Sequence, residues 1–531
     1  MRSSKTLILV FIAFVVFASA AQPLCVAQQP LGPRETRGKQ IYLQGTSPSG
    51  KEIRAYIGDE QLEVPGSTMP CASCHGQTGQ GLPEGGVIPS NITWETLTKP
   101  YGLTHASGRK HPPYTSRAVE LALTRGLDPA GNKLLPVMPR YAMSPEDMAD
   151  LILYLGVVGK DLDPGLTDSS ITIGTVLPAK GALAEMGQGI KATMSAVFAD
   201  VNAAGGIYNR RLELKVAEAG DNAAATRGNF ETLLTTTPVF ASTGAFVAGG
   251  EKELLSLFDQ RSIPLVGPFT LYPGIAGLQS RTFHLLSGLD DQVRALVDYS
   301  ARTPELKKSG LAIVAAEREL NVSMVDAVKR QSRTSGLREP QVLTYVADKF
   351  DSAGTVKQLQ ASGRQGVFLL GSSADAMSFM KEAEKVGWFP YIFLPGALTG
   401  GDLMNAPAGF DKRIILSFPT SPADHSAAGL NEFRAFVARH QLPSKHVASQ
   451  IQAYVAAQLL IEGLKRAGRS LSRENLVRAL EGLYEHQTGL IPPITYGPNR
   501  HIGALGAHII TVDLKQKQFA PAGGWVALDG K

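Results

Sequence analysis

The sequence Cys-Ala-Ser-Cys-His at residues 71–75 decides what the first part of this 531-residue chain folds around. Cys71 and Cys74 stand three positions apart, and His75 follows directly. With three cysteines and ten histidines in the chain, chance produces this pattern with a probability of about 3 in 10,000. Two thiols at this spacing add across the two vinyl groups of one haem, and the adjoining imidazole becomes an axial ligand of the iron. We therefore expect one covalent haem c, bonded to Cys71 and Cys74 and ligated by His75.

Two other uses of paired cysteines explain the motif less well. A structural zinc site needs a second set of ligands, and the chain has no second cysteine pair. A redox-active dithiol does not call for a histidine directly after the second cysteine. The motif therefore favours haem attachment.

The second axial ligand must come from later in the chain, and Met138 is the best candidate. Pro136 and Pro139 bracket it, and prolines fix the backbone φ. The stretch therefore presents the thioether from a stiff loop, whereas a methionine in a helix usually fills the core. The alternative ligands are Met143, five residues on, and then Met69, His105 and His111.

Helical patterns around the motif predict an all-α haem domain over residues 33–160. A short helix is expected over 35–43. Ser144 is a hydroxyl cap followed by proline and two acids, so a second helix should carry the apolar face of residues 148–157. In small c-type cytochromes the first and last helices cross near the haem. The small and aromatic residues that resemble those of such a crossing are Gly38, Tyr42 and Tyr154.

The first 27 residues have the layout of a secretory signal peptide. Arg2 and Lys5 precede the apolar stretch 7–18, and small residues follow. Cleavage is expected after Ala20 or after Ala27. The apolar stretch is too short to span a bilayer comfortably, and no later run of about 18 apolar residues exists. We expect a periplasmic protein, with a lipid anchor on Cys25 as a minor alternative because residues 22–24 fit a lipoprotein cleavage site poorly.

Length and composition limit the remaining possibilities. At roughly 150 residues per domain, 531 residues suggest about three packing units. Lys and Arg number 52 against 47 Asp and Glu, and the resulting net charge of +5 is too weak on a large surface to suggest nucleic acid as a partner.

The pattern changes after residue 160. Residues 161–169 read as a linker, and residues 170–526 alternate between strands and helices, which predicts an α/β domain with mainly parallel sheets and crossover helices. Ligands bind beyond the carboxyl ends of the strands in such sheets. The strands are expected at residues 171–177, 212–216, 311–315, 341–346, 367–371, 391–395 and 413–418.

Both parts resemble known families. The segments Gly85–Thr93, Arg125–Asp128 and Met138–Pro139 resemble the haem domains in the cytochrome subunits of periplasmic alcohol and sugar dehydrogenases, over about 130 residues. In that family the matching histidine and methionine are the axial pair, which implies His75 and Met138. Those subunits usually carry three such domains, whereas this chain has one.

The later part resembles type I periplasmic solute-binding proteins of the branched-chain amino-acid and amide group. The likeness covers about 350 residues, and it implies two α/β lobes, joined by three chain crossings, that close over a small solute. The segments that carry it are Asp200–Arg211, Asp221–Asn222, Ile263–Pro268 and Tyr454–Ala457.

Loop residues at the expected strand ends are candidates for solute binding. Hydroxyl groups there can bind a carboxylate, an aromatic ring can cover an apolar group, and an acid such as Glu319 can pair with an ammonium group. The same residues could equally serve turns or hinge packing. The candidates are Ser242, Thr243, Phe269, Thr270, Tyr272, Glu319 and Ser372, with Gly244, Asn321, Ser373 and Gly396 beside them.

Together these features predict a periplasmic electron-transfer protein, not an enzyme, whose His/Met-ligated haem is coupled to a small-solute-binding domain. Iron with two protein ligands has no vacant position for a substrate. One alternative is a solute receptor of an ATP-driven importer of the branched-chain amino-acid or amide type, with an accessory haem. Another is a haem enzyme such as a peroxidase, which requires Met138 to leave the iron. Expected partners are a periplasmic redox protein, such as a quinoprotein dehydrogenase or a terminal cytochrome, a small solute and an importer permease.

Overall fold

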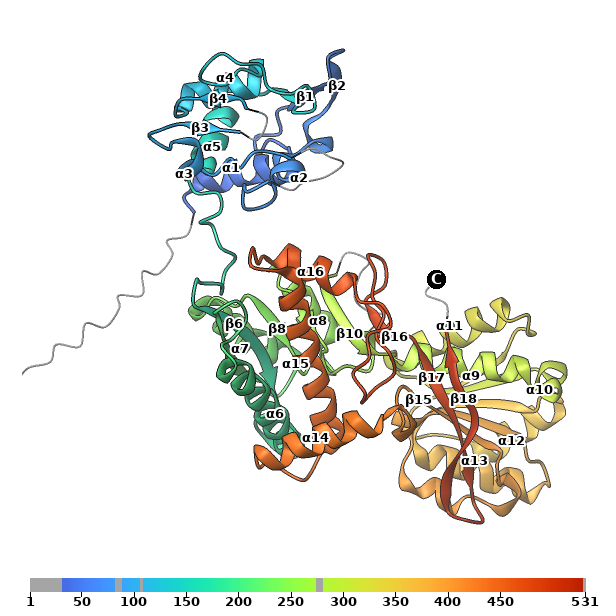
Figure 1. Cartoon of the computed structure of the whole chain (residues 1–531). Coiled ribbons are helices and arrows are strands. Elements are labelled where there is room, and N and C mark those ends of the chain that lie inside the picture. Colours follow the sequence, from blue (N-terminus) through green and yellow to red (C-terminus); the bar gives the residue numbers. More distant parts are fainter. Residues whose placement is uncertain (1–30, 82–87, 106–107, 274–279, 529–531) are drawn as a thin grey trace, which may run out of the picture. The chain divides into compact units, whose positions relative to one another are not determined.

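The computed structural model describes residues 31–81, 88–105, 108–273 and 280–528. The expected signal peptide and the stretch 85–87 of the first resemblance lie outside these residues. The chain divides into two compact units, the first ending at Asp161 and the second beginning at Leu162 (Figure 1). Within the described residues, no helix combines the length and the apolarity needed to cross a membrane.

The first unit is mainly helical, and its two longest helices are α1 (Pro33–Gln44) and α5 (Pro145–Leu155). The Ser144 hydroxyl accepts a hydrogen bond from the Asp147 N–H, and proline occupies the first turn of α5, so the expected cap is confirmed. The shorter elements are β1 (Arg54–Ile57), β2 (Leu62–Pro65), α2 (Cys71–His75), α3 (Trp94–Leu97), β3 (Leu103–Thr104), β4 (Lys110–His111), α4 (Ser116–Arg125) and β5 (Arg140–Ala142).

The helices α1 and α5 pack against each other at the expected crossing. Gly38 is needed there because an added Cβ would overlap the Asp150 carbonyl oxygen on α5. The rings of Tyr42 and Tyr154 lie 5.4 Å apart across the same contact, and both are buried. The residues expected at the crossing are therefore the residues found there.

A small antiparallel sheet is the part of this unit that the sequence did not predict. Its strand order is β2-β1-β5, and β3 pairs with β4 separately. Strands of two to four residues are too short to show a readable alternation of apolar and polar side chains, so an all-α domain was the simpler expectation. The strand β5 directly follows Met138–Pro139 and so anchors the expected ligand loop.

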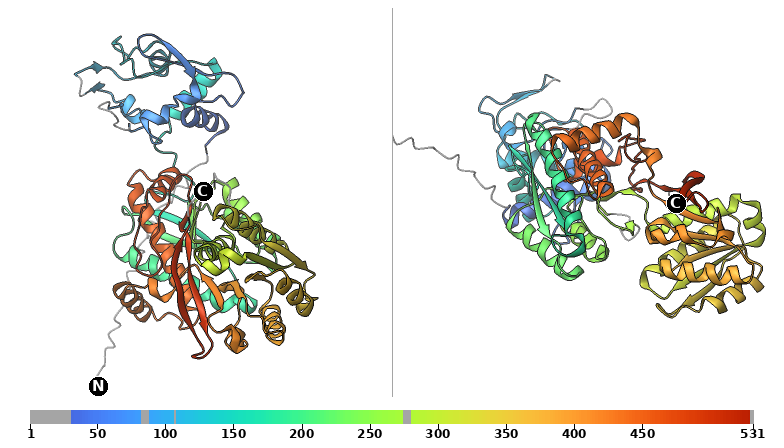
Figure 2. Two further views of the ribbon diagram at one scale, coloured as in Figure 1. Left: turned by 90° about the vertical axis from the view of Figure 1, so that its right-hand side faces the viewer. Right: turned by 90° about the horizontal axis from the view of Figure 1, so that it is seen from below.

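The first lobe of the second unit is built on a parallel sheet with the order β16-β10-β9-β8-β6-β7. Its helices cover both faces of the sheet (Figure 2). After α6 the pair Gly205–Gly206, both with positive φ, turns the chain into the next strand as expected. The elements are β6 (Ser170–Leu177), α6 (Ala184–Ala203), β7 (Arg211–Glu218), α7 (Ala223–Thr236), β8 (Ala241–Thr243), α8 (Glu251–Gln260), β9 (Leu265–Val266), β10 (Thr282–Leu286), α14 (Ala427–Arg439), α15 (Val447–Ala467), α16 (Arg473–Glu481) and β16 (Ile502–Ala504).

The second lobe has a sheet with the order β12-β11-β13-β14-β15-β17-β18, parallel from β12 to β15 and antiparallel beyond. The five strands expected in this lobe all form within one residue of their expected bounds. The elements are α9 (Leu289–Arg302), α10 (Pro304–Ser309), β11 (Leu311–Ala316), α11 (Glu319–Thr334), β12 (Gln341–Tyr345), α12 (Ser352–Ala361), β13 (Gly366–Leu370), α13 (Ser373–Lys385), β14 (Tyr391–Pro395), β15 (Ile414–Phe418), β17 (Gly506–Asp513) and β18 (Gln518–Ala527).

The chain crosses between the lobes three times: after β10, after β15 and between β16 and β17. Ser287 connects two of these crossings, since its hydroxyl donates to the Ala504 carbonyl (2.9 Å) and accepts from the Gly506 N–H (2.8 Å). The two lobes and the crossover topology agree with the expectation.

The structure corrects the expectation that residues 161–169 form a linker. Asp163 accepts a hydrogen bond from the Arg473 N–H at 2.6 Å, and Leu166 is 2% exposed and bridges to Ile171. Residues 162–169 are therefore folded onto the second unit. The Asp-Pro-Gly run indicates a turn, and a turn on a folded surface has the same local chemistry as a linker.

Candidate functional site

The attachment motif forms the short helix α2, and the chain that follows it orients the histidine. His75 is 9% exposed, and its Nδ1 lies 2.9 Å from the carbonyl oxygen of Ser90. A carbonyl oxygen only accepts, so Nδ1 carries the proton and Nε2 presents its lone pair. Among the described residues, Nε2 has no hydrogen-bond partner. An imidazole that ligates a metal through Nε2 needs this tautomer and this support.

Two buried tyrosines hold the ends of α2. Tyr42 donates its hydroxyl proton to the Gly76 carbonyl (2.6 Å) just after the helix, and Tyr141 donates to the Met69 carbonyl (2.7 Å) just before it. Burial raises the pKa of Cys71 to about 12, so its thiol stays neutral. A thioether is neutral as well, and haem attachment at Cys71 therefore places no charge in this apolar setting.

Met138 ends a tight turn that is shaped by proline. Its N–H donates to the Leu135 carbonyl at 3.1 Å, with Pro136 at the second position of the turn, where a fixed φ suits the geometry. The Met138 side chain is half-buried and packs against the hydrophobic core of the first unit. Cys71 packs against the same core, so the two expected haem contacts share one apolar region.

Arg140 holds this loop in place. Its guanidinium donates to the carbonyl oxygens of Met138 and, at 3.1 Å, of Leu134. The side chain lies against Gly126, where φ is +67° and an added Cβ would overlap the guanidinium. Burial lowers the pKa of Arg140, yet a guanidinium remains charged at any pH of interest. Arg140 thus positions the Met138 loop, a role that its local sequence does not reveal.

The alternative iron ligands have other surroundings. His105 and His111 face each other, with 3.0 Å between their Nε2 atoms. Met69 and Met143 pack against the same core as Met138, and Met143 also lines a cavity of about 550 Å³ with Tyr141. Ligation by Met138 rather than Met143 stays a prediction. Among the described residues, no group of three or more His, Cys, Asp or Glu side chains could hold a separate metal ion.

The residues around α2 fit a haem. They combine two neighbouring free thiols, an imidazole with its Nε2 available and an apolar surround. The partly buried side chains of this region that pack against the core are Met69, Cys71, Ala72, Ile92, Trp94, Leu134, Met138 and Met143.

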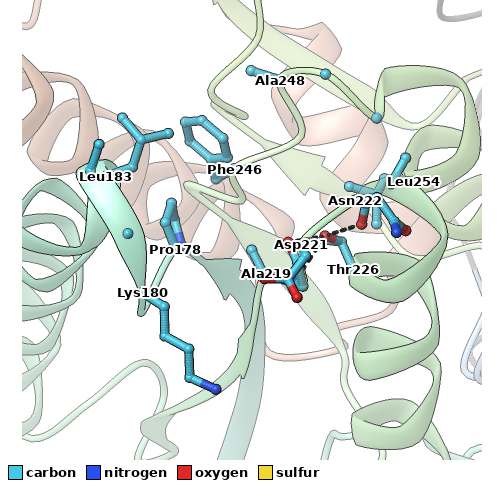
Figure 3. A pocket seen from close by; sticks show the side chains of 16 residues that line it. Pro178, Lys180, Leu183, Ala219, Asp221, Asn222, Thr226, Phe246, Ala248 and Leu254 are labelled. Atoms are coloured by element: carbon cyan, nitrogen blue, oxygen red, sulfur yellow. Dashed lines mark hydrogen bonds between the residues drawn. The ribbon is translucent and has the colours of Figure 1, made fainter.

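The second unit has a pocket of about 490 Å³ in its first lobe. It lies at the carboxyl ends of β6, β7 and β8, where the loops lead into α6, α7 and α8 (Figure 3). Leu183, Phe246 and Leu254 contribute apolar surface, and Lys180 and Asp221 are its charged side chains. Such a pocket suits a small solute with an apolar part and a polar or charged end.

Two of the residues predicted to bind a solute lie inside the sheet of the first lobe. Ser242 and Thr243 are both fully buried inside β8, and each hydroxyl donates to a backbone carbonyl of a neighbouring strand, Gly174 at 2.6 Å and Val266 at 3.1 Å. Neither hydroxyl is available to a solute, so this part of the prediction is wrong. Two of the three residues of β8 carry hydroxyl groups, and so short a polar strand has the sequence of a loop.

The other candidates of the first lobe lie in the loop after β9. Thr270 donates its hydroxyl proton to Glu251 at 2.9 Å, and Glu251 also accepts from the Gly249 N–H at 2.9 Å. Phe269 and Tyr272 are buried. Burial, then the nearby Asp290 and Glu251, raises the pKa of Tyr272 to about 12. None of these three candidates lines the pocket of about 490 Å³.

In the second lobe, Glu319 is the exposed first residue of α11. Ser372 caps α13, and its hydroxyl and N–H both donate to Asp375. Asn321 is buried and donates to the carbonyls of Ala316 and Leu370. Solute binding by Glu319 or Ser372 stays a prediction. The pocket residues Lys180 and Phe246 were missed because nothing in their local sequence marks them, whereas Asp221 was noticed only through the resemblance.

Two family models match the chain. The model described as periplasmic binding protein covers residues 170–518, and the model described as cytochrome c covers residues 67–158. Among curated relatives, the Leu/Ile/Val-binding protein homolog 3 of Brucella melitensis is 20% identical over 314 residues, which are 59% of this chain and 83% of the relative. An amino acid binding protein of Pseudomonas aeruginosa is 21% identical over 272 residues, 50% of this chain and 72% of the relative.

Solved structures show the same fold for the second unit. A branched chain amino acid ABC transporter protein from Thermus thermophilus with bound valine has a TM-score of 0.53 at 17% identity, covering 69% of this chain and 98% of that one. A fatty acid ABC transporter substrate-binding protein from Thermomonospora curvata has a TM-score of 0.51 at 18% identity, covering 70% and 95%. At these identities the likeness establishes the two-lobed fold alone.

Proposed function

The chain belongs to the periplasmic binding protein family and carries a cytochrome c domain before the binding domain, and from this premise we propose that it is a periplasmic electron-transfer protein coupled to a solute receptor. The cytochrome c domain implies covalently bound haem c. The observation that carries the proposal is His75, buried on α2 beside two free thiols, with Nδ1 held by Ser90 and Nε2 open. One haem is proposed because the sequence has one attachment motif.

Each residue of the site has a separate task. Cys71 and Cys74 form the two thioether bonds, and His75 offers Nε2 to the iron while the Ser90 carbonyl holds its ring. Met138 offers its thioether from the turn that Arg140 braces. The bound haem supplies a one-electron carrier. If His75 and Met138 both bind the iron, the haem would exchange electrons and would have no vacant position for a substrate.

Absorption spectroscopy of the haem-loaded protein tests the ligand assignment. The oxidised protein should show a methionine-to-iron charge-transfer band, which Met138→Leu should abolish. Met143→Leu is the matched control, because Met143 packs against the same core five residues later. Loss of the band in Met143→Leu instead would reassign the ligand. Rapid binding of carbon monoxide to the reduced wild-type protein would favour a haem enzyme such as a peroxidase.

The second unit supports the binding role. The pocket at the carboxyl ends of β6, β7 and β8 lies where α/β sheets bind ligands. A thermal-shift panel of amino acids, amides, aliphatic acids and aromatic acids tests it, since a ligand at 100 times its Kd stabilises the fold by about 2.7 kcal/mol. Asp221→Asn should weaken the binding of a solute that carries a positive charge, and Lys180→Met should weaken the binding of one that carries a negative charge. No response across the panel would count against a receptor.

A second candidate function is a receptor for an ATP-driven importer. It is favoured by the relatives and solved structures, whose names include Leu/Ile/Val-binding and ABC transporter proteins. The partner would then be an importer permease. In the electron-transfer proposal it would be a redox protein such as a quinoprotein dehydrogenase or a terminal cytochrome. Copurification from a periplasmic extract, with the haem content of the bound partner measured, distinguishes the two.

The proposed location is the periplasm, reached through a signal peptide at residues 1–27. Mass spectrometry of the exported protein would give the cleavage site, after Ala20 or after Ala27. A lipid on Cys25 would add a defined mass and retain the protein with membranes.

A further inference from the structure

Two histidines outside the proposed iron ligands form an unusual contact. His105 follows β3, and His111 ends β4. Their Nε2 atoms lie 3.0 Å apart, and the Nη2 of Arg109 lies 2.9 Å from the same His105 Nε2. Arg109 only donates, so His105 Nε2 accepts. His105 is then protonated on Nδ1 when it is neutral.

The contacts of His111 show which of its ring nitrogens carries a proton. His111 Nδ1 lies 2.8 Å from the Pro112 carbonyl, which only accepts, so Nδ1 carries a proton there as well. If His111 is neutral, its Nε2 lone pair faces the accepting Nε2 of His105 at 3.0 Å. One added proton on His111 Nε2 removes this repulsion, because that N–H then donates to His105. The geometry therefore creates a site for one proton, and the pair titrates as a unit.

The charges around this site balance without the added proton. Arg109 is paired with Asp128 at 2.6 Å, and the Asp128 side chain is fully buried. Burial opposes ionisation of Asp128, but its hydrogen bonds with Asn132 and Arg109 outweigh this and lower its pKa. Tyr114 packs its ring edge-on against His111, with 4.9 Å between ring centroids. Burial, then Arg109 and His111, lowers the pKa of His105.

A short path connects the pair with the proposed iron ligand. His105 Nδ1 lies 3.4 Å from the Ser90 hydroxyl oxygen, and the carbonyl of the same serine accepts the His75 Nδ1 proton at 2.9 Å. The path from His105 through Ser90 to His75 consists of two hydrogen bonds and one residue, and it spans on the order of 10 Å. Over such a distance, at an effective dielectric constant of about 20, one unit of charge changes a binding constant about tenfold.

From this geometry we infer that the His105–His111 pair takes up one proton when the haem is reduced, so that the chain couples electron transfer to proton uptake. The inference rests on the proposed electron-transfer function. The redox partner supplies one electron and solvent supplies one proton, and the new bond is His111 Nε2–H. On oxidation the electron and the proton leave together. Removing one positive charge from the haem centre raises the proton affinity of the nearby pair.

The test is the midpoint potential of the full, haem-loaded protein as a function of pH. A tenfold higher proton affinity in the reduced state raises the potential by about 59 mV as the pH falls through the titration of the pair. His111→Gln keeps a hydrogen-bonding side chain without the proton site and should flatten the profile. His105→Gln keeps His111 but replaces the imidazole that its Nε2 faces, so it should move the pH at which the potential changes. His446→Gln is the control, since His446 is exposed in the second unit, and it should leave the profile unchanged.

The outcomes separate this inference from the proposed function. A wild-type potential that does not depend on pH, or a dependence that His111→Gln keeps unchanged, overturns it and leaves the haem propionates as the proton site. A haem that exchanges no electrons instead refutes the electron-transfer proposal. If a variant loses its haem, two measurements on the wild-type protein decide the question. One is proton uptake on reduction in weakly buffered solution, and the other is NMR of the His105 and His111 rings. Ring signals that do not shift between the redox states refute the His105–His111 pair as the proton site.

Discussion

Lowering the pH should destabilise the second unit through one buried histidine, His284. It lies in β10, is 2% exposed, and neither ring nitrogen has a hydrogen-bond partner among the described residues. The Thr282 hydroxyl, two residues earlier in the same strand, is also buried and unpartnered. Burial, and then the nearby His501, lowers the pKa of His284 from 6.5 to about 3. The imidazole is therefore neutral in the folded protein.

The magnitude follows from linkage. Between pH 6.5 and pH 3 the unfolded chain binds a proton at His284 that the folded protein excludes, so stability falls as the pH falls. From pH 8 to pH 5 this single group removes about 2 kcal/mol from the free energy of unfolding. Replacing it by His284→Leu removes that loss, because leucine does not titrate.

Urea unfolding of the full chain at pH 8, 6.5 and 5 provides the assay, followed by circular dichroism and by the fluorescence of Trp388 and Trp525, which both belong to the second unit. The wild-type protein and the control His446→Gln should lose about 2 kcal/mol more between pH 8 and pH 5 than His284→Leu does. Equal losses in all three proteins would refute the reasoning. The comparison uses slopes with pH, so any packing change in the leucine variant cancels.

Three further predictions concern the two sites. Arg140→Lys should lower the fraction of protein with the methionine charge-transfer band, because a single ammonium cannot reach both the Met138 and the Leu134 carbonyls; an unchanged band would show that the loop does not need the guanidinium. Gly126→Ala should destabilise the first unit by at least about 1 kcal/mol in thermal melts, because φ is +67° and the Cβ meets Arg140. Ser242→Ala should lower the stability of the second unit by about 1 kcal/mol, because the hydrogen bond to the Gly174 carbonyl is lost, while the Kd of any identified solute is unchanged in calorimetry. A weakened Kd would return Ser242 to the solute site.

Regular elements of the second unit could be predicted from sequence because burial on both sides makes parallel strands continuously apolar. The strand Leu311–Ala316 is fully buried at every position, and Tyr391–Pro395 forms with the expected bounds. The three-residue strand β8 does not show this apolar pattern, because two of its residues, Ser242 and Thr243, carry hydroxyl groups. Only the pairing of β8 with β6 and β9 places them inside the sheet.

The segment 162–169 shows a different limit. Its composition predicts a turn, which is what it forms between Asp163 and Leu166. Whether a turn is free or docked depends on a partner such as Arg473, which lies some 300 residues away in sequence. Local sequence carries no information about a contact of that range.

The haem attachment could be predicted from five consecutive residues, because two thioether bonds and an adjoining imidazole require a fixed spacing along the chain. No distant segment is needed to form that pattern. The order of strands and helices in the second unit was readable for a similar reason, since side-chain periodicity is a local property. Tertiary structure alone decided that the Ser90 carbonyl holds His75, that Arg140 braces the Met138 loop and that His105 meets His111. These contacts depend on backbone carbonyls and on distant segments brought together by folding, and a backbone carbonyl is the same at every residue of a sequence.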